Sequence, residues 1–290
     1  MDLGRRRFWT VLSVFLVAAL AGGAGAADRQ AAALSFDPPS DRIAAAQVCS
    51  LAVIYDGSDV TQGLRGYHLV IDFDDAYVFV DSLETDVVEG GFLSGVGETS
   101  FSADLEDVNT LVVDCSILGE TPGAFGVGEL CTIMFTGQTE GDGVSPIAFT
   151  EVDLMDPDNA PIAYGATDGS IELDNTPPNV PTMAPEPEYT YGTSNTVYWS
   201  DESASGAVGY CAECSENPEF DPIYMSSGCT PTLEFAFSPL VYDQIYYYRV
   251  KCRDDLMNTS GWSEAVYSTQ TEQAASVERS TWSAIKAMFQ

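Results

Sequence analysis

Short stretches in which apolar and polar residues alternate recur along most of this chain, and they restrict its fold more than any other feature of the sequence. In GYHLVIDFD, residues 66–74, every second side chain from Tyr67 to Phe73 is apolar. Successive side chains of a β-strand point to opposite faces of the sheet, so such a stretch buries one face and exposes the other. Eight stretches of this kind, separated by Gly, Asp, Pro and Ser, lie between residues 47 and 174. The pattern predicts an antiparallel β-sandwich over residues 34–174.

A proline-rich segment at residues 175–195 forms a linker and the entry to a second group of alternating stretches. Consecutive prolines favour an extended, stiff spacer. Beyond the segment, a period of two recurs at Val197 and Trp199 and again from Tyr246 to Cys252. The sequence therefore predicts a second, smaller sandwich over residues 177–272, and an all-β fold with two antiparallel sandwich domains.

The N-terminus has the pattern of a signal peptide. Three arginines at positions 5–7 precede an apolar run, residues 8–20, that is shorter than the roughly 20 residues needed to cross a bilayer, and Ala-Gly-Ala at 24–26 fits a cleavage site. GRRRFW also resembles a twin-arginine signal, but no cofactor motif follows, which favours general secretion. Residues 1–26 are predicted to be removed on export, which predicts a secreted, extracellular or cell-surface protein.

The last part of the chain, residues 273–290, has a different periodicity. Its apolar side chains would gather on one side of a short C-terminal helix: Val277, Trp282, Ile285, Met288 and Phe289. This amphipathic tail either docks on a domain, frays, or acts as a sorting or attachment signal.

The charge of the chain is strongly negative. It has 44 Asp and Glu against 11 Lys and Arg, a formal net charge of -33, and the acidic residues are spread along the chain. A surface of this sign repels phosphate backbones and anionic lipid headgroups, which excludes nucleic-acid binding and docking on an anionic membrane. After the predicted signal peptide, no segment is apolar enough for membrane insertion.

Seven cysteines lie in the part of the chain that is predicted to be exported, where disulfides persist, and an odd number leaves at least one thiol free or paired between molecules. Cys115 and Cys131 would both face the core on neighbouring strands, which predicts a disulfide between them. A further bridge is expected among Cys211, Cys214, Cys229 and Cys252. The alternative is that these cysteines are small buried apolar residues.

The residue types of the chain limit which catalytic arrangements it can form, because His68 is its only histidine. A Ser-His-Asp or Cys-His arrangement would have to use it. Alternation puts His68 on the outer face of its strand, beside no nucleophile motif, so it is interpreted as a surface residue. Cys211-x-x-Cys214 lacks the second pair of a zinc site, and with 44 acidic residues no spacing identifies a glycosidase pair. The chain is predicted not to be an enzyme.

One acidic segment has the residue types of a calcium site. In DLMDPDNAPI, residues 153–162, oxygen ligands are offered by Asp153, Asp156, Asp158 and Asn159. The segment lacks the glycine and the terminal glutamate of an EF-hand loop, and Asp-Pro-Asp-Asn is also typical of a hairpin turn. Calcium binding and a structural turn are therefore two interpretations, and no other cofactor is expected.

The polar side of the alternating strands predicts a binding face. Outward residues of three strands would share the surface of one sheet: His68, Val70 and Asp72; Val112, Asp114 and Ser116; and Leu130, Thr132 and Met134. Apolar side chains grouped on an exposed sheet mark interaction surfaces more often than solvated walls. The alternative is that the second domain or a loop covers them.

Residues 34–174 resemble the cohesin family. LSFDPPS is similar to its first strand, GLRGYHLVIDFDDAYVFVDSLE to its loop and following strands, and GVGELCTIMFTG and SPIAFTEVDLMDPDNAPIAYGATDGSIELD to its later strands, in the family's order. Many cohesins have an Asp-Pro-Ser-Val-Leu turn where this chain has Asp74-Asp75-Ala76-Tyr77-Val78. In cohesins a face built from the corresponding strands binds the partner, so the resemblance implies a non-catalytic scaffold module that binds a dockerin-like protein module.

Residues 177–272 resemble a fibronectin type III domain, with TPPNVP as the entry, Trp199 in the second strand and IYYYRVKCRD as the tyrosine-bearing strand. In secreted bacterial proteins such domains are usually spacers or adhesion modules, and the resemblance implies that role. The cohesin fold is also close to carbohydrate-binding sandwiches. Polysaccharide binding, and a purely structural role at the cell surface or in a matrix, therefore stay as alternatives.

Overall fold

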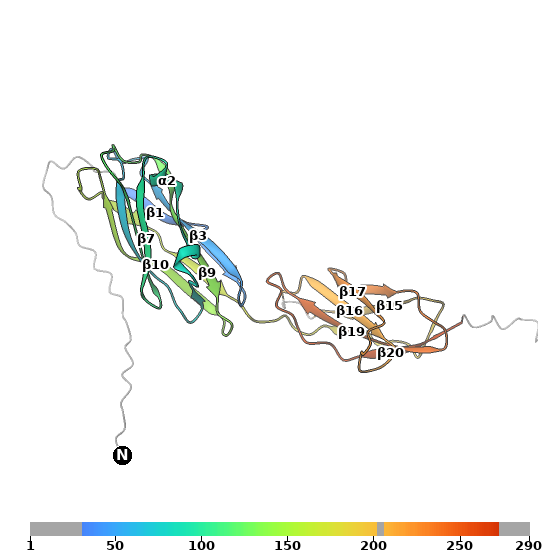
Figure 1. Cartoon of the computed structure of the whole chain (residues 1–290). Coiled ribbons are helices and arrows are strands. Elements are labelled where there is room, and N and C mark those ends of the chain that lie inside the picture. Colours follow the sequence, from blue (N-terminus) through green and yellow to red (C-terminus); the bar gives the residue numbers. More distant parts are fainter. Residues whose placement is uncertain (1–30, 202–205, 273–290) are drawn as a thin grey trace, which may run out of the picture.

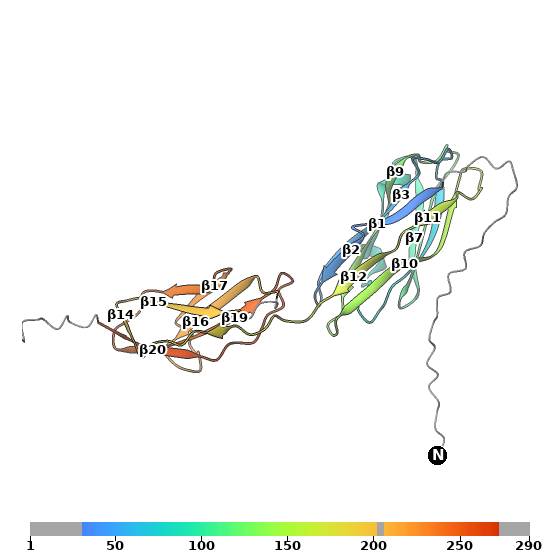
Figure 2. The same ribbon diagram turned by 180° about the vertical axis from the view of Figure 1, so that it is seen from behind.

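The computed structural model describes residues 31–201 and 206–272, which form two β-sandwiches arranged end to end (Figure 1, Figure 2). Strands β1 to β12 surround one cluster of buried hydrophobic residues, and strands β13 to β20 surround another. The predicted all-β fold is confirmed. The predicted signal peptide and the predicted C-terminal helix lie outside the described residues. None of the described helices is long and apolar enough to cross a membrane.

The first sandwich contains two six-stranded sheets. Sheet A has the order β11-β1-β3-β9-β5, with β6 also paired to β9, and sheet B has the order β2-β12-β10-β4-β8-β7. The strands of sheet A are β1 (Ala32–Asp37), β3 (Val48–Asp56), β5 (Val78–Phe79), β6 (Val87–Glu89), β9 (Val127–Gly137) and β11 (Tyr164–Ala166). The strands of sheet B are β2 (Ser40–Ile43), β4 (Gly66–Asp72), β7 (Thr99–Asp107), β8 (Thr110–Ile117), β10 (Gly143–Met155) and β12 (Gly169–Leu173). Two short helices, α1 (Leu83–Asp86) and α2 (Gly91–Ser94), precede β6 and β7.

The predicted alternation is present in β4. Tyr67, Leu69 and Ile71 are at most 4% exposed and join the core, whereas His68 and Val70 are half-buried on the outer face. Because burial of apolar side chains is the main favourable contribution to folding, this division sets which face of the strand turns toward sheet A.

The chain changes sheets between β8 and β9, so these strands are not neighbours. β8 pairs with β4 and β7 in sheet B, whereas β9 pairs with β3, β5 and β6 in sheet A. Cys115 on β8 and Cys131 on β9 are both buried, as expected, but both thiols are free. The predicted Cys115–Cys131 disulfide is wrong, because alternation shows the side to which a thiol points but not which strand lies beside it.

The second sandwich packs a three-stranded sheet C against a five-stranded sheet D. Sheet C has the order β13 (Thr182–Met183), β15 (Asn195–Ser200) and β18 (Glu234–Phe237). Sheet D has the order β14 (Tyr189–Tyr191), β20 (Val266–Thr271), β19 (Gln244–Arg253), β16 (Gly209–Ser215) and β17 (Met225–Thr230). Val197, Tyr246 and Tyr248 are fully buried between the sheets, as their period of two predicts.

One disulfide joins neighbouring strands of sheet D. Cys211 on β16 and Cys229 on β17 are opposite each other in register, with their Cα atoms 4.2 Å apart. This is the bridge expected among the four cysteines of the second sandwich. Cys214 and Cys252 lie in its core, and their thiols are free.

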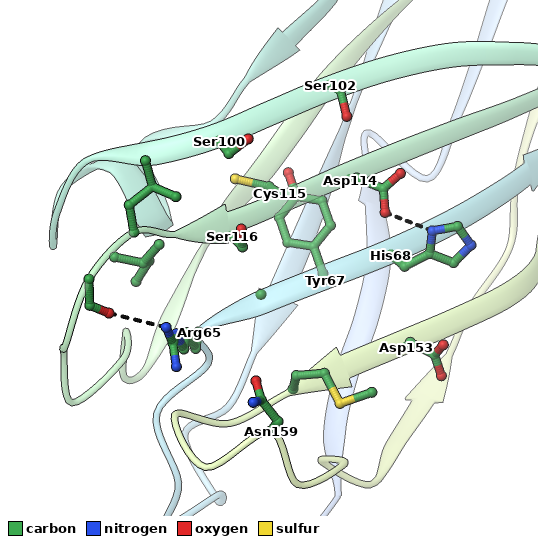
Figure 3. Close-up of a pocket in the computed structure, with 15 residues that line it drawn as sticks. Arg65, Tyr67, His68, Ser100, Ser102, Asp114, Cys115, Ser116, Asp153 and Asn159 are labelled. Atoms are coloured by element: carbon green, nitrogen blue, oxygen red, sulfur yellow. Dashed lines mark hydrogen bonds and ion pairs between the residues drawn. The ribbon is translucent and has the colours of Figure 1, made fainter.

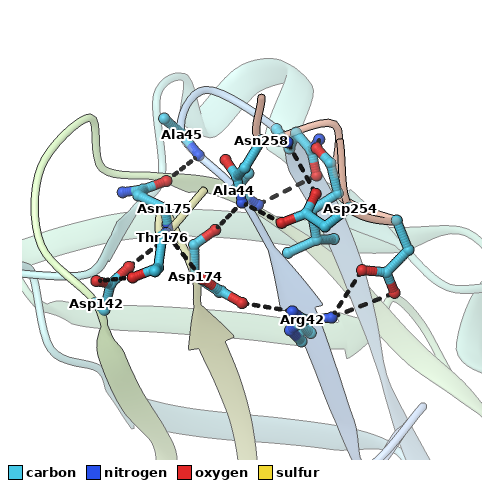
Figure 4. Close-up of polar contacts among 12 residues, drawn as sticks. Arg42, Ala44, Ala45, Asp142, Asp174, Asn175, Thr176, Asp254 and Asn258 are labelled. Atoms are coloured by element: carbon cyan, nitrogen blue, oxygen red, sulfur yellow. Dashed lines mark hydrogen bonds and ion pairs between the residues drawn. The ribbon is translucent and has the colours of Figure 1, made fainter. Parts of the chain in front are cut away.

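Polar contacts join the end of the first sandwich to a loop of the second (Figure 4). The Arg42 guanidinium on β2 forms ion pairs with Asp174, which follows β12, and with Asp255, which follows β19. Asn258 Nδ2 donates a hydrogen bond to the Asp174 carbonyl at 2.9 Å. Direct contacts therefore accompany the proline-containing connection between the two sandwiches.

Candidate functional site

The outer face of sheet B is built by four neighbouring strands, β10, β4, β8 and β7. Residues directly opposite each other on antiparallel strands point to the same side, so the register defines rows across the sheet. In the order β10, β4, β8, β7 the rows are Glu151, Val70, Val112 and Asp104; Asp153, His68, Asp114 and Ser102; and Met155, Gly66, Ser116 and Ser100. This surface is called the four-strand face.

His68 lies in the middle row of the four-strand face, between two carboxylates (Figure 3). Its Nδ1 is 2.8 Å from Asp114 Oδ1, and this contact orients the imidazole ring. Asp153 is opposite His68 on the other neighbouring strand. The side chains of His68 and Asp114 are 34% and 51% exposed, so a bound partner could contact both.

The His68–Asp114 pair is not completed by a nucleophile in the described part of the chain. Ser102 is opposite Asp114 on β7, on the side away from His68. Within residues 31–201 and 206–272, the hydrogen-bond partner of the imidazole is Asp114, and no hydroxyl or thiol bonds to the ring. Nucleophilic catalysis needs such a group within hydrogen-bond reach.

The buried thiols are also poor nucleophiles. Burial raises the pKa of Cys49, Cys115 and Cys214 to about 12, and burial raises the pKa of Cys131 as well. The thiolate is the reactive form, and it is scarce at neutral pH when the pKa is this high. These cysteines act as small apolar residues of the cores.

A cavity of about 500 Å³ opens on the four-strand face (Figure 3). Arg65, which precedes β4, donates hydrogen bonds to the carbonyls of Pro157 at 3.0 Å and Gly119 at 3.1 Å. The cavity can hold a partner's side chain that combines an apolar stem with a polar end, because its walls supply both kinds of surface. The lining residues include Arg65, His68, Asp114, Ser116, Leu118, Asp153 and Met155.

Carboxylates surround an apolar centre on the four-strand face. Val70 and Val112 are opposite each other and half-buried. His68 lies in the neighbouring row, and Arg65 lies beyond the end of β4, five residues from Val70, so the charged groups next to the two valines are carboxylates. A partner that fits must therefore offer apolar contacts surrounded by basic groups. The carboxylates belong to Asp72, Asp104, Asp114, Glu151 and Asp153.

Three residues predicted for this face lie elsewhere. Leu130, Thr132 and Met134 are on β9, in sheet A. Leu130 is only 1% exposed, because a β-bulge opposite Val53 and Ile54 places it inside together with Cys131. The other predicted residues do share the face: His68, Val70, Asp72, Val112, Asp114 and Ser116.

The contributions of β7 and β10 were missed by sequence reasoning. On β7, the inward alternation of Phe101, Ala103 and Leu105 is the signal that could have identified the strand and its outward serines. On β10, a bulge between Phe149 and Glu151 shifts the alternation, so the residues after it cannot be assigned from those before it.

The four candidate calcium ligands are divided between two features. Asp153 belongs to the four-strand face, whereas Asp156, Asp158 and Asn159 form the turn after β10. Asp156 Oδ1 accepts hydrogen bonds from the backbone N–H groups of Asp158 at 2.9 Å and Ala160 at 2.8 Å, which closes the turn. Among the described residues, no group of three or more His, Cys, Asp or Glu could hold a metal ion. The turn has a structural explanation, and calcium binding stays a prediction.

No protein-family model and no curated protein matches this chain. Among solved structures, it is similar to a non-cellulosomal cohesin from the archaeon Archaeoglobus fulgidus, with 14% identity and a TM-score of 0.40 over 50% of this chain and 92% of that chain. It is similar to a type I cohesin–dockerin complex from Clostridium thermocellum, with 14% identity and a TM-score of 0.40 over 53% of this chain and 99% of that chain. A type III cohesin module from a cell-surface anchoring scaffoldin of Ruminococcus flavefaciens has 12% identity and a TM-score of 0.40, over 54% of this chain and 97% of that chain.

Proposed function

We propose that the first sandwich is a cohesin-like, non-catalytic binding module outside the cell, and that its four-strand face binds a dockerin-like protein module. The observation that carries the proposal is the Val70–Val112 pair at the centre of an exposed sheet surface, with carboxylates around it. The resemblance of residues 34–174 to cohesins supports the class of partner, and the signal-peptide pattern supports export. The fibronectin type III-like second sandwich would act as a spacer.

The apolar pair and the carboxylates would contribute differently to binding. A partner side chain that covers both valines removes apolar surface from water, which stabilises a complex by roughly 25 cal/mol per Å². Carboxylates around the edge of the contact select basic partners and speed association more than they add affinity. The face therefore suits a protein with apolar side chains inside a ring of Lys and Arg.

A polysaccharide suits this face less well. Flat apolar faces of sugar rings pack on exposed aromatic side chains, and the three rows contain no Phe, Tyr or Trp. The composition of the four-strand face therefore favours a protein partner over a polysaccharide here.

Binding of the exported chain to a panel of purified dockerin modules, measured by biolayer interferometry, tests the proposal. The double variant Val70→Asp, Val112→Asp places two like charges opposite each other in the centre of the contact. It is expected to weaken binding at least tenfold, because the apolar contact is lost and two carboxylates are buried without partners.

The matched control is Val48→Asp, since Val48 is an exposed valine (59%) on β3 of sheet A. It should bind like the wild type. Thermal unfolding would check that all variants are folded. The proposal fails if no dockerin binds, or if the control weakens binding as much as the double variant.

A further inference from the structure

Strand β19 divides its side chains between the core of the second sandwich and the outer face of sheet D. Tyr246, Tyr248, Val250 and Cys252 are fully buried. Alternate side chains of a strand point to opposite faces, so the remaining residues face outward. In chain order they are Ile245, Tyr247, Arg249, Lys251 and Arg253.

The three cations of this row are unusual in so acidic a chain. Of the eleven Lys and Arg residues, five lie within 31–201 and 206–272, and three of those five are on this side of β19. Arg249 pairs with Glu213 on β16, with 2.7 Å between Nη2 and Oε2. In the described part of the chain, Lys251 and Arg253 have no carboxylate within 4.0 Å, so their charges can pair with a ligand.

Aromatic rings hold two of these cations in place. The guanidinium carbon of Arg249 lies 4.1 Å from the ring centroid of Phe220 and 4.1 Å from that of Trp262. Lys251 Nζ lies 4.8 Å from the Trp262 ring centroid. Cation–π contacts restrict these long side chains and leave their charge in place. The row is therefore ordered before any ligand arrives, which lowers the entropic cost of binding.

Tyrosines continue the same surface toward the other edge of sheet D. Tyr267 on β20 is opposite Tyr247, their ring centroids are 5.7 Å apart, and Tyr267 is 59% exposed. On β14, Thr190 donates a hydrogen bond to a buried side chain of β20, so Tyr189 and Tyr191 point outward, where they are 49% and 57% exposed. Within the described residues, exposed aromatic rings thus share one face with Lys251 and Arg253, which have no carboxylate partner there.

We propose that this outer face of sheet D binds an acidic polysaccharide. Sugar rings would lie on the exposed tyrosines, whose rings are large, rigid and apolar with a polar hydroxyl at one end. Carboxylate or sulfate groups of the polymer would pair with Lys251 and Arg253 through charge-assisted hydrogen bonds. From residue 245 to residue 253, β19 is about 27 Å long at about 3.4 Å per residue, enough for several consecutive sugars.

The net negative charge of the chain does not oppose this proposal locally. At physiological ionic strength, exposed charges more than about 8 Å apart are largely screened, so a polymer on this face responds mainly to the groups next to it. Glu213 on β16 is already paired with Arg249, and Glu188, which accepts a hydrogen bond from the Tyr189 hydroxyl, lies at the β14 edge of the sheet. The site is independent of the function proposed for the four-strand face.

Affinity electrophoresis of the full exported chain, in gels that contain a dissolved polymer, tests the proposal. Polygalacturonate supplies carboxylates, dextran sulfate supplies sulfates, and plain dextran supplies neither. We expect retardation by one or both acidic polymers and none by dextran. The double variant Lys251→Glu, Arg253→Glu should lower the affinity at least tenfold, and Tyr267→Ala several fold.

The matched control is Tyr198→Ala, because Tyr198 is 50% exposed on β15 of the opposite sheet C. It should be retarded like the wild type, and circular dichroism would check the folding of each variant. Four results would overturn the proposal: no retardation by either acidic polymer, equal retardation by dextran, equal effects of the control and the sheet D variants, or stronger retardation by single-stranded DNA than by the polysaccharides.

Discussion

Single residues in this protein take their chemical character from the side of the strand on which they lie. His68 faces outward, where Asp114 orients its ring at 2.8 Å, whereas its neighbour Tyr67 is buried and donates its hydroxyl hydrogen to the Leu130 carbonyl at 2.8 Å. The same division buries five free thiols. A side chain with reactive chemistry can therefore be unreactive in this protein because it points into the core.

The five free thiols should be unreactive in the folded protein. Burial raises the pKa of Cys49, Cys115 and Cys214 to about 12, so the thiolate is scarce at pH 8. Labelling with iodoacetamide at pH 8, read by mass spectrometry, should modify none of the five in the native protein and all five in guanidinium chloride. Cys211 and Cys229 should stay unlabelled in both, as an internal control. Modification of Cys115 in the native protein at the rate seen in denaturant would contradict its burial.

Pairs of adjacent strands, rather than single strands, build both candidate surfaces. β4 and β8 bring Val70 beside Val112, and β19 and β20 bring Tyr247 beside Tyr267. β17 lies at the edge of sheet D and pairs with one strand, β16. The disulfide between β16 and β17 therefore adds a covalent link to an edge strand that is otherwise paired with one neighbour.

Removal of the disulfide should destabilise the second sandwich. Cys211 and Cys229 are 18 residues apart, and a loop of this size corresponds to about 3 kcal/mol of lost entropy in the unfolded chain. The double variant Cys211→Ala, Cys229→Ala should lower the free energy of unfolding by about that amount, measured by urea denaturation with tryptophan fluorescence. Three of the four tryptophans lie in residues 177–290, and the fourth is Trp9, so the signal reports the second sandwich. Reduction of the wild type should have the same effect, and a change below about 1 kcal/mol would count against this role.

At the scale of the whole molecule, the two sandwiches meet through polar contacts and keep separate hydrophobic clusters. Besides the Arg42–Asp255 ion pair, Gln47 Nε2 donates to the Leu256 carbonyl at 2.7 Å. Polar interfaces of this kind commonly permit relative motion of domains. The relative orientation of the four-strand face and the outer face of sheet D therefore depends on a few side chains at the junction.

Arg42→Ala should loosen the junction. Hydrogen bonding to the Arg42 guanidinium lowers the pKa of the Asp174 carboxyl below its ordinary value of 3.8. Because exposed ion pairs contribute at most about 1 kcal/mol, the melting temperature should change little. Distances between one spin label on each sandwich, measured by double electron–electron resonance, should nevertheless become more widely distributed.

Acid should reproduce part of this loosening in the wild type, because Asp174, which follows β12 in the same sandwich as Arg42, helps to hold the guanidinium that pairs with Asp255 across the junction. A carboxyl with a lowered pKa stabilises the contact at pH values above its unfolded pKa, and the contribution is lost as the pH falls through the lowered folded value. The wild type should therefore show the wider distance distribution only below about pH 4, and Arg42→Ala at every pH. A narrow distribution in Arg42→Ala at neutral pH would show that other contacts hold the junction.

The direction of most strand side chains was determined by the sequence alone. Tyr67 and Leu69 are buried and His68 faces outward, as alternation predicts, and the same holds for Tyr246 and Tyr248. This is because the side to which a residue points depends on its immediate neighbours along the strand. The all-β class and the two sandwiches follow from the same local pattern.

Only the tertiary structure decided which strands are neighbours. Pairing joins residues far apart in the chain, so alternation cannot show that β9 belongs to sheet A. Thr132 and Met134 therefore lie on a different sheet from the four-strand face. A bulge exists only relative to a partner strand, which is why the burial of Leu130 could not be predicted. In the same way, Cys211 bonds to Cys229 because β17 lies beside β16, a proximity set by the packing of the whole sheet.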